Sequence, residues 1–234
     1  NATALPIASM KIIPIGLTYW GTFIEKYEII IAGTTIKINN PTNSGSVEFC
    51  GKEFIVKDTA KSIDSGMAMV PESRREQGLF LERSLLENTS LPYLKNFSSW
   101  VYGLNKRQEY DEVDDSCMTT MVKHSGLEKE VQFLSGGNQQ KVALGKWLSI
   151  SPELILIDEP TRGVDVGARA EIYNKIREIA DSGKAVVIAS TDLLEISNLP
   201  DRVICFYKGC YVSELVGEEI NSNNILQAIT NPEK

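Results

Sequence analysis

Two carboxylates directly follow an apolar run in the segment LILIDEP, residues 154 to 160. Four apolar residues in a row predict a strand buried in a parallel sheet, and ligands bind beyond the carboxyl ends of such strands. At that edge Asp158 could hold a Mg²⁺ that bridges phosphate oxygens, and Glu159 could orient or deprotonate a water. A solvated strand end gives the same pattern, so this segment alone leaves both interpretations open.

A second segment, FLSGGNQQK at residues 133 to 141, has the composition of a helix start that could bind an anion. Ser135 can cap the helix, while Gly136 and Gly137 let the backbone approach a ligand closely. Free N–H groups and the positive end of the helix dipole would then face the anion. A plain capped helix that serves no ligand is the alternative, and capping alone favours it.

A third segment, IPIGLTYWGTF at residues 13 to 23, has the frame of a phosphate-binding loop. Four residues separate Gly16 from Gly21 after an apolar run, but Thr22 and Phe23 occupy the places of the Lys and the Ser or Thr. The chain therefore lacks the charge that reaches phosphate and the hydroxyl that binds metal, and two aromatic rings oppose the close wrap of the backbone. We interpret the segment as a phosphate loop that is no longer competent, with an unrelated turn as the alternative.

The elements that would position these groups are clearest after residue 149. The pattern predicts a strand at 154–157, a helix at 166–180 and a second strand at 185–189. Continuous apolar strands joined by a helix indicate parallel pairing with both faces covered. A buried stripe on the helix follows from the spacing of Ile172, Ile176 and Ile179.

Upstream of residue 149 the pattern changes twice. Residues 73–134 contain no convincing strand and include a helix predicted at 106–124, so they form a mostly helical insertion. The face of that helix is predicted from the spacing of Tyr110, Val113, Cys117 and Met121. Within the first 65 residues, EFCGKEFIV predicts an antiparallel strand pair and IIIAGTTIKINN has strand propensity. The fold class is α/β with a mostly parallel sheet, an antiparallel β edge sheet and an inserted helical lobe.

Composition excludes several kinds of partner. The 234 residues are 42% hydrophobic and 24% charged, as in ordinary globular proteins, and a net charge of −7 without any basic block argues against nucleic acid. The four cysteines are scattered and there is one His, which disfavours structural zinc and indicates a reducing compartment. Apolar runs are too short for a membrane span and the N-terminus has no basic start, so we expect any membrane link to go through another protein.

Taken together, LSGGNQQK followed by ILIDEPTRGVD resembles the signature sequence and Walker B segment of ATP-binding-cassette (ABC) ATPases. TRGVDVGARAEIY and PESRREQGLFLERSLLEN are similar to the carboxyl-terminal cassette of the ATPase subunits of bacterial simple-sugar importers. The resemblance covers about residues 44 to 230. It implies a single cassette, a fragment of a longer chain, with a RecA-like P-loop NTPase core at 1–72 and 135–234 and a helical subdomain at 73–134.

The resemblance also implies roles for individual residues. In a sandwich of two cassettes, Asp158 would bind Mg²⁺ and Glu159 would be the general base. Asp165 would lie in the loop that crosses to the other site. The signature residues would contact the γ-phosphate of ATP held by the partner cassette, and they are Ser135, Gly136, Gly137, Asn138 and Gln139.

The sequence departs from the family's pattern at three places. Glu72 stands where a glutamine usually faces Mg²⁺ and water, and Thr191 stands where many cassettes have a switch histidine. Threonine can hydrogen-bond but cannot carry a positive charge toward phosphate. The third departure is the phosphate loop, where Gly16, Gly21 and Thr22 would be the contacts. Either the chain is a degenerate half that completes a partner's ATP site, or residues 1–43 are not the native family segment.

The function that the resemblance implies is coupling of ATP binding and hydrolysis to sugar uptake. The expected partners are a second cassette, membrane permease subunits and, indirectly, an extracellular sugar-binding protein. The expected location is the cytoplasmic face of the cell membrane. Two rival functions stay open, an inactive structural or regulatory ABC module and an ABC protein that does not act in transport.

Overall fold

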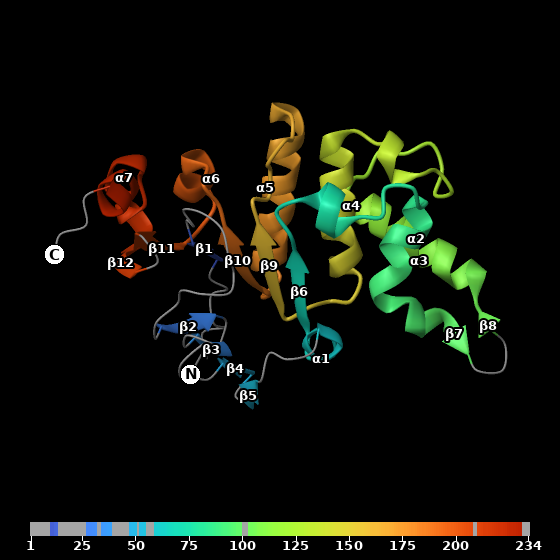
Figure 1. The fold of residues 1–234 in the computed structure, drawn as a ribbon, viewed down its shortest axis with the longest axis horizontal. Coiled ribbons are helices and arrows are strands. Elements are labelled where there is room, and N and C mark those ends of the chain that lie inside the picture. The colour runs from blue at the N-terminus through green and yellow to red at the C-terminus, as the bar shows by residue number, and fades with distance from the viewer. Residues whose placement is uncertain are drawn as a thin grey trace, which may run out of the picture.

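A six-stranded sheet is the centre of the computed structural model (Figure 1). The structure describes residues 10–13, 27–31, 34–38, 47–50, 52–54, 59–99, 103–207 and 210–230. The strand order is β12-β11-β1-β10-β9-β6, and only the β11–β12 pair is antiparallel. The strands are β1 (Met10–Ile13), β6 (Met67–Val70), β9 (Leu154–Asp158), β10 (Ala185–Ala189), β11 (Arg202–Tyr207) and β12 (Cys210–Val216).

Strands β9 and β10 are confirmed where the sequence predicts them. All five residues of β10 are buried, as expected of a strand covered on both faces. The register pairs Ala185 with Leu154 and Ala189 with Asp158, so the two strands end side by side. Strand β1 lies between β10 and β11, and it comes from a segment far from both in the chain.

Helices follow the parallel strands and cover the sheet. Helix α5 has the predicted buried stripe of three isoleucines and begins at the capping residue Asp165. Helix α5 contacts β10, α7 contacts β11 and β12, and α4 contacts both β6 and α5. The bounds are α1 (Thr59–Asp64), α4 (Gly136–Leu148), α5 (Val166–Asp181), α6 (Leu193–Asn198) and α7 (Ser222–Thr230).

Helical segments of residues 73–134 lie beyond β6 at the right-hand end of Figure 1. The main helices are α2 (Leu85–Ser90) and α3 (Lys106–Thr119), with shorter helical turns at Arg74–Gly78, Leu91–Phe97 and Val131–Phe133. The expectation of no strand here is wrong in one detail, because β7 (Ser98–Ser99) pairs with β8 (Gly103–Leu104). These strands have two residues each and no apolar alternation, so the sequence pattern gives no sign of them.

The predicted face of α3 needs a correction. Val113 and Cys117 are buried, but Tyr110 and Met121 are 43% and 44% exposed. The helix ends at Thr119, and Met121 takes a left-handed backbone with a φ of 53°, which turns it off the helical face. Glu109 is buried instead, because the Ser90 hydroxyl donates a hydrogen bond to its carboxylate at 2.6 Å.

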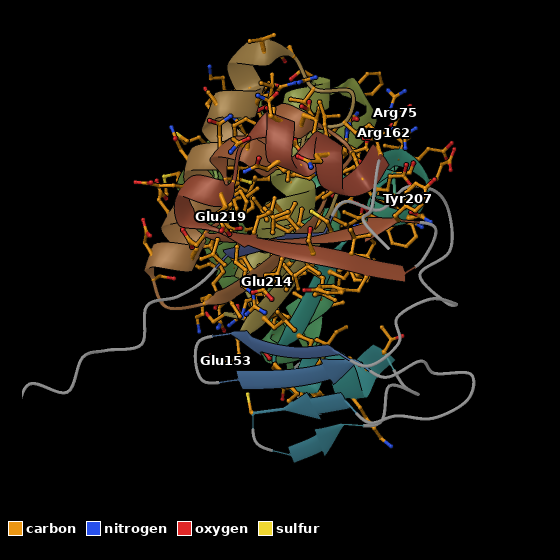
Figure 2. All side chains as sticks on the ribbon, turned by 90° about the vertical axis from the view of Figure 1, so that its left-hand side faces the viewer. Arg75, Glu153, Arg162, Tyr207, Glu214 and Glu219 are labelled. Atoms are coloured by element: carbon orange, nitrogen blue, oxygen red, sulfur yellow. The ribbon has the colours of Figure 1, made fainter. Side chains whose placement is uncertain are left out.

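The antiparallel strand pair predicted from EFCGKEFIV is confirmed, and a second antiparallel pair forms where IIIAGTTIKINN predicts only strand propensity. Strand β2 (Tyr27–Ile31) pairs with β3 (Thr34–Ile38), and β4 (Val47–Phe49) pairs with β5 (Lys52–Phe54). They lie on the side of the main sheet opposite to the helices (Figure 2). No helix among the described residues is long and apolar enough to cross a membrane.

Candidate functional site

The carboxyl ends of β9 and β10 bring together residues that the sequence assigns to catalysis. Glu159 directly follows Asp158, and its N–H donates a hydrogen bond to the Ala189 carbonyl at 2.8 Å. Thr191 follows β10, and both its N–H and its hydroxyl donate to Oε1 of Glu159 at 2.8 Å. Asp158 is partly buried at the strand end next to them. Glu159 and Thr191, which the sequence predicts as catalytic residues, are thus in direct contact.

Glu159 has a backbone conformation that is unusual for a residue with a side chain. Its φ is 47°, in the left-handed region, which costs a non-glycine residue about 1–2 kcal/mol. Such strain persists where the surroundings hold it, and it gathers at functional sites. The backbone of Glu159 is held on both sides, because its N–H bonds to Ala189 and its carbonyl accepts from the N–H of Arg162 at 3.2 Å.

Glu72 comes from the loop after β6, the strand beside β9. Its carboxylate forms an ion pair with Arg162, in the turn after β9. Both side chains are largely exposed, so we expect a contribution to stability of at most about 1 kcal/mol. The contact shows that the loop after β6 and the turn after β9 are neighbours at the sheet edge.

Arg74 joins the same two segments from a partly buried position. Its guanidinium donates to the carbonyl of Arg162 at 2.8 Å and to that of Gly163 at 3.2 Å. Burial, and then the charge of Arg75, lowers the pKa of Arg74. Arg162 lies on the helix-bearing side of the molecule, away from the antiparallel pairs (Figure 2). Sequence reasoning missed Arg74, since its partners are backbone carbonyls that no residue pattern reveals.

The N-terminus of α4 is the capped helix start that the sequence predicts. The Ser135 hydroxyl accepts a hydrogen bond from the N–H of Asn138 at 3.4 Å. A Cβ on Gly136 would lie 2.8 Å from the Arg74 guanidinium, and a Cβ on Gly137 would lie 2.5 Å from Cβ of Ala168. Gly137 is therefore required by close packing against α5, whereas the nearest backbone atom to a Cβ on Gly136 would be the Gly163 carbonyl oxygen at 3.1 Å. Ser135, at the exposed start of the helix, keeps the capacity to contact an anion.

Asn138 and Gln139 have their side chains turned to the protein. Oδ1 of Asn138 accepts from the N–H of Lys123 at 3.0 Å. Gln139 is 1% exposed, and its amide donates to the carbonyl of Val131 at 3.1 Å. These side chains fix the segment that leads into α4, so any ligand contact from this turn would come from the backbone or from Ser135.

Asp165 connects this helix start with the turn after β9. Its carboxylate caps α5 by accepting from the N–H of Ala168 at 3.0 Å. Oδ2 of Asp165 lies 3.5 Å from the position of a Cβ on Gly137. Asp165 therefore packs beside the start of α4 as well as capping α5.

Three predicted contacts, Gly16, Gly21 and Thr22, lie outside the described residues. Strand β1, which precedes them, is parallel to β10 and ends opposite Ala189. The chain thus leaves β1 at the same sheet edge as Glu159 and Thr191. Among the residues that the structure describes, no group of three or more His, Cys, Asp and Glu side chains could hold a metal ion. Asp158 offers a carboxylate at this edge, which is the kind of protein ligand that Mg²⁺ takes together with water and phosphate oxygens.

Comparisons with known proteins find a matching family and similar relatives. The ABC transporter family model matches residues 31–162. The chain is 41% identical over 186 residues to the ribose import ATP-binding protein RbsA of Chelativorans sp. (strain BNC1), covering 79% of this chain and 36% of that protein. It is 35% identical over 189 residues to RbsA of Bacillus subtilis (strain 168), covering 80% and 38%.

Solved structures show the same fold. A nucleotide-free ATP-binding cassette from an ABC transporter has a TM-score of 0.68 at 20% identity, covering 94% of this chain and 84% of that one. A dimeric bacterial ABC transporter cassette has a TM-score of 0.65 at 17% identity, covering 89% and 85%. The chain spans little more than a third of the length of the curated relatives. With the family model matched across more than half of its residues, the chain belongs to the ABC transporter family.

Proposed function

We propose that this chain is an ATP-binding cassette of a bacterial carbohydrate importer, which couples ATP binding and hydrolysis to sugar uptake. The observation that carries the proposal is the contact of Thr191 with Glu159 beside Asp158, at the edge where β1 also ends. The relatives are named as ribose import proteins, which supports a simple sugar as the transported solute.

In this proposal Asp158 supplies a carboxylate for Mg²⁺, and Glu72 faces the same region from the loop after β6. Glu159 is the general base. Both Thr191 bonds go to Oε1, so Oε2 is the oxygen that accepts the proton of the attacking water. Thr191 orients this carboxylate and takes the place of a switch histidine without supplying positive charge.

The N-terminus of α4 serves a second ATP site in the proposed sandwich. Ser135 and the backbone at Gly136 and Gly137 would contact the γ-phosphate bound to the partner cassette, with Asn138 and Gln139 holding the turn. Asp165 would lie in the loop that crosses between the sites.

Residues 13 to 23 decide whether the chain also binds ATP on its own. Thr22 and Phe23 supply neither the Lys nor the metal-binding hydroxyl, so we propose that Gly16, Gly21 and Thr22 no longer cradle phosphate tightly. The chain would then act mainly by completing the partner's site, and its own Glu159 would act only on weakly held ATP.

The wider assembly follows from the same proposal. The α/β core comprises residues 1–72 and 135–234, and the helical subdomain comprises residues 73–134. The partners are a second cassette and membrane permease subunits, with an extracellular sugar-binding protein acting through the permease. The cassette is placed at the cytoplasmic face of the membrane.

The assembled importer tests the proposed function. Ser135→Arg, which fills the helix end with a large cation, should abolish ATP hydrolysis at the partner's site and sugar uptake. Glu128→Gln, which alters an exposed carboxylate outside the site, is the matched control and should change neither rate. Wild-type hydrolysis and uptake in the Ser135→Arg importer would contradict the proposal.

Calorimetry of Mg-ATP binding tests the phosphate loop separately. A Glu159→Gln variant prevents turnover during the titration. No binding by the chain alone supports a loop that has lost its function, whereas micromolar binding overturns that part of the proposal and returns Glu159 to a working site.

A further inference from the structure

Glu195 is a buried carboxyl group behind the site, and the proposed catalysis does not use it. It lies in α6 and is 1% exposed. Thr161 and Ser190, which donate hydrogen bonds to it, are 2% and 1% exposed. A buried carboxyl group is costly unless it is hydrogen-bonded, so its presence calls for an explanation.

Three hydroxyl groups from three different elements converge on Glu195. The Thr161 hydroxyl, in the turn after β9, donates to Oε1. Tyr173 in α5 also donates to Oε1, at 3.2 Å, and Ser190 at the end of β10 donates to Oε2 at 2.5 Å. The hydroxyl of Ser190 also accepts from the N–H of Asp192 at 3.0 Å. Glu195 therefore fastens the turn after β9 to the turn after β10.

These two turns are the ones that carry the proposed catalytic pair. Thr161 follows Glu159 by two residues, and Ser190 directly precedes Thr191. On the outer side the turns are joined by the bonds from Thr191 to Glu159. On the buried side they are joined through Glu195, so the two turns are connected both at the surface and in the interior.

The buried connection can hold Glu159 in its left-handed backbone conformation. A strained residue keeps its conformation only when its neighbours hold it, and the next turn of chain is anchored at Thr161. Without the anchor, the turn could relax and carry the Glu159 carboxylate away from Thr191. A shift of about 1 Å in a reacting group is enough to lower a rate by about a hundredfold.

We propose that Glu195 is a positioning residue, which fixes the Glu159 carboxylate against Thr191 by fastening the turns after β9 and β10 to each other. The proposal rests on the proposed function for its catalytic meaning. Its structural content, the fastening of the two turns, is measurable whether or not the chain hydrolyses ATP.

Burial raises the pKa of Glu195, and the hydroxyl groups of Ser190 and Thr161 act in the opposite direction. Asp192 lies nearby, and it forms an ion pair with Arg169 at 3.2 Å. The fastening requires hydrogen-bond acceptors at this position, which a glutamine side chain supplies in part. Glu195→Gln is therefore the conservative variant, and Glu195→Ala is the disruptive one.

Hydrogen exchange of the whole chain, read by mass spectrometry over peptides that contain the N–H groups of Glu159 and Thr191, tests the fastening. Glu195→Ala should accelerate exchange at both groups at least about tenfold, while Glu195→Gln should remain within about threefold of the wild type. Glu109→Ala is the matched control, because it removes another buried carboxyl group that accepts from a serine, far from the site. It should leave exchange at Glu159 and Thr191 unchanged.

Equal acceleration in Glu195→Ala and Glu109→Ala, or acceleration spread evenly over the chain, would overturn the proposal. If Glu195→Ala does not fold, Thr161→Val and Ser190→Ala each remove one donor, and each should accelerate exchange at Glu159. Unchanged exchange in both would equally overturn it.

The assembled importer then separates positioning from the proposed function. A site that hydrolyses ATP should show a lower kcat and an unchanged KM for ATP in Glu195→Ala, with recovery in Glu195→Gln. If variants of this chain alter hydrogen exchange but none of them alters ATP hydrolysis by the importer, the proposed function is refuted. The fastening of the two turns is then established.

Discussion

At the scale of single residues, the site depends on Glu159. This residue combines a strained backbone with a side chain held by two donors from Thr191. The sequence predicted Glu159 from its place after a strand, because ligands bind beyond the carboxyl ends of parallel strands, and it predicted Thr191 from the family resemblance. It could not predict the contact itself or the left-handed φ, which depend on the register that pairs Asp158 with Ala189.

Replacing Thr191 by Val tests the contact. Val keeps the shape and the backbone donor but removes the hydroxyl bond to Glu159, so the free energy of unfolding should fall by about 1 kcal/mol. Thr191→Ser keeps the hydroxyl and should stay close to the wild type. Urea unfolding measures both variants, and equal stability of the Val and Ser variants would show that the hydroxyl bond contributes nothing.

Cys117 gives a prediction about alkaline pH. Burial, and then the charge of Asp114, raises the pKa of its thiol from 9.0 to about 12. Between these values the unfolded chain releases the proton and the folded chain keeps it. The stability that the buried thiol contributes is therefore complete below pH 9 and is lost as the pH rises toward about 12.

Cys117→Ala removes this pH dependence. Between about pH 8 and about pH 10.5, the stability advantage of the wild type over the variant should shrink by ~2 kcal/mol. Ile176→Val shortens a buried side chain that carries no titratable group, and its difference from the wild type should stay constant. The measurement is urea unfolding across this pH range, and parallel curves for wild type and Cys117→Ala would contradict the prediction.

At the scale of elements, predictions succeeded where the apolar spacing is regular. They failed where hydrogen bonds of polar groups determine which residues are buried or in contact. Helix α5 and strands β9 and β10 follow their apolar patterns. The face of α3 was wrong because the bond from Ser90 draws Glu109 inside, and a carboxylate in an apolar pattern looks like a solvent-facing residue. The Arg74 contacts with the turn after β9 were missed because the acceptors are backbone carbonyls, which no residue pattern marks.

The start of α4 allows a matched test of packing. Gly137→Ala would place a Cβ 2.5 Å from Cβ of Ala168, so we expect a loss of about 1–3 kcal/mol in the free energy of unfolding. Gly167→Ala, in the facing helix α5, meets only an ordinary contact of 3.4 Å and should gain about 0.5–1 kcal/mol from helix propensity. Urea unfolding of both variants decides, and a neutral Gly137→Ala would mean that α4 and α5 can separate at no cost.

At the scale of the whole molecule, one cluster of buried apolar side chains extends from β6 to α7 among the described residues. Leu85 in α2 and Ile176 in α5 belong to this cluster, and both are nearly inaccessible to solvent. The proposed boundary between core and helical subdomain therefore crosses a continuous apolar interior. Continuous packing of this kind favours cooperative unfolding of both parts together.

Leu85→Ala and Ile176→Ala should lower the same unfolding transition, each by about 2–5 kcal/mol. Far-UV circular dichroism and tryptophan fluorescence, recorded on one urea series, should give coincident curves for both variants. A separate early transition in Leu85→Ala alone would show that the helical part unfolds independently.

The place of β1 in the sheet has a consequence for synthesis on the ribosome. This strand precedes every other described element, yet Met10 pairs with Val186 and Lys11 pairs with Arg202. Both neighbours are translated after most of the other described elements, so the nascent β1 remains without its partners until β10 and β11 have been synthesised. The sheet, and with it the edge that carries Glu159 and Thr191, can close only when translation has passed β11.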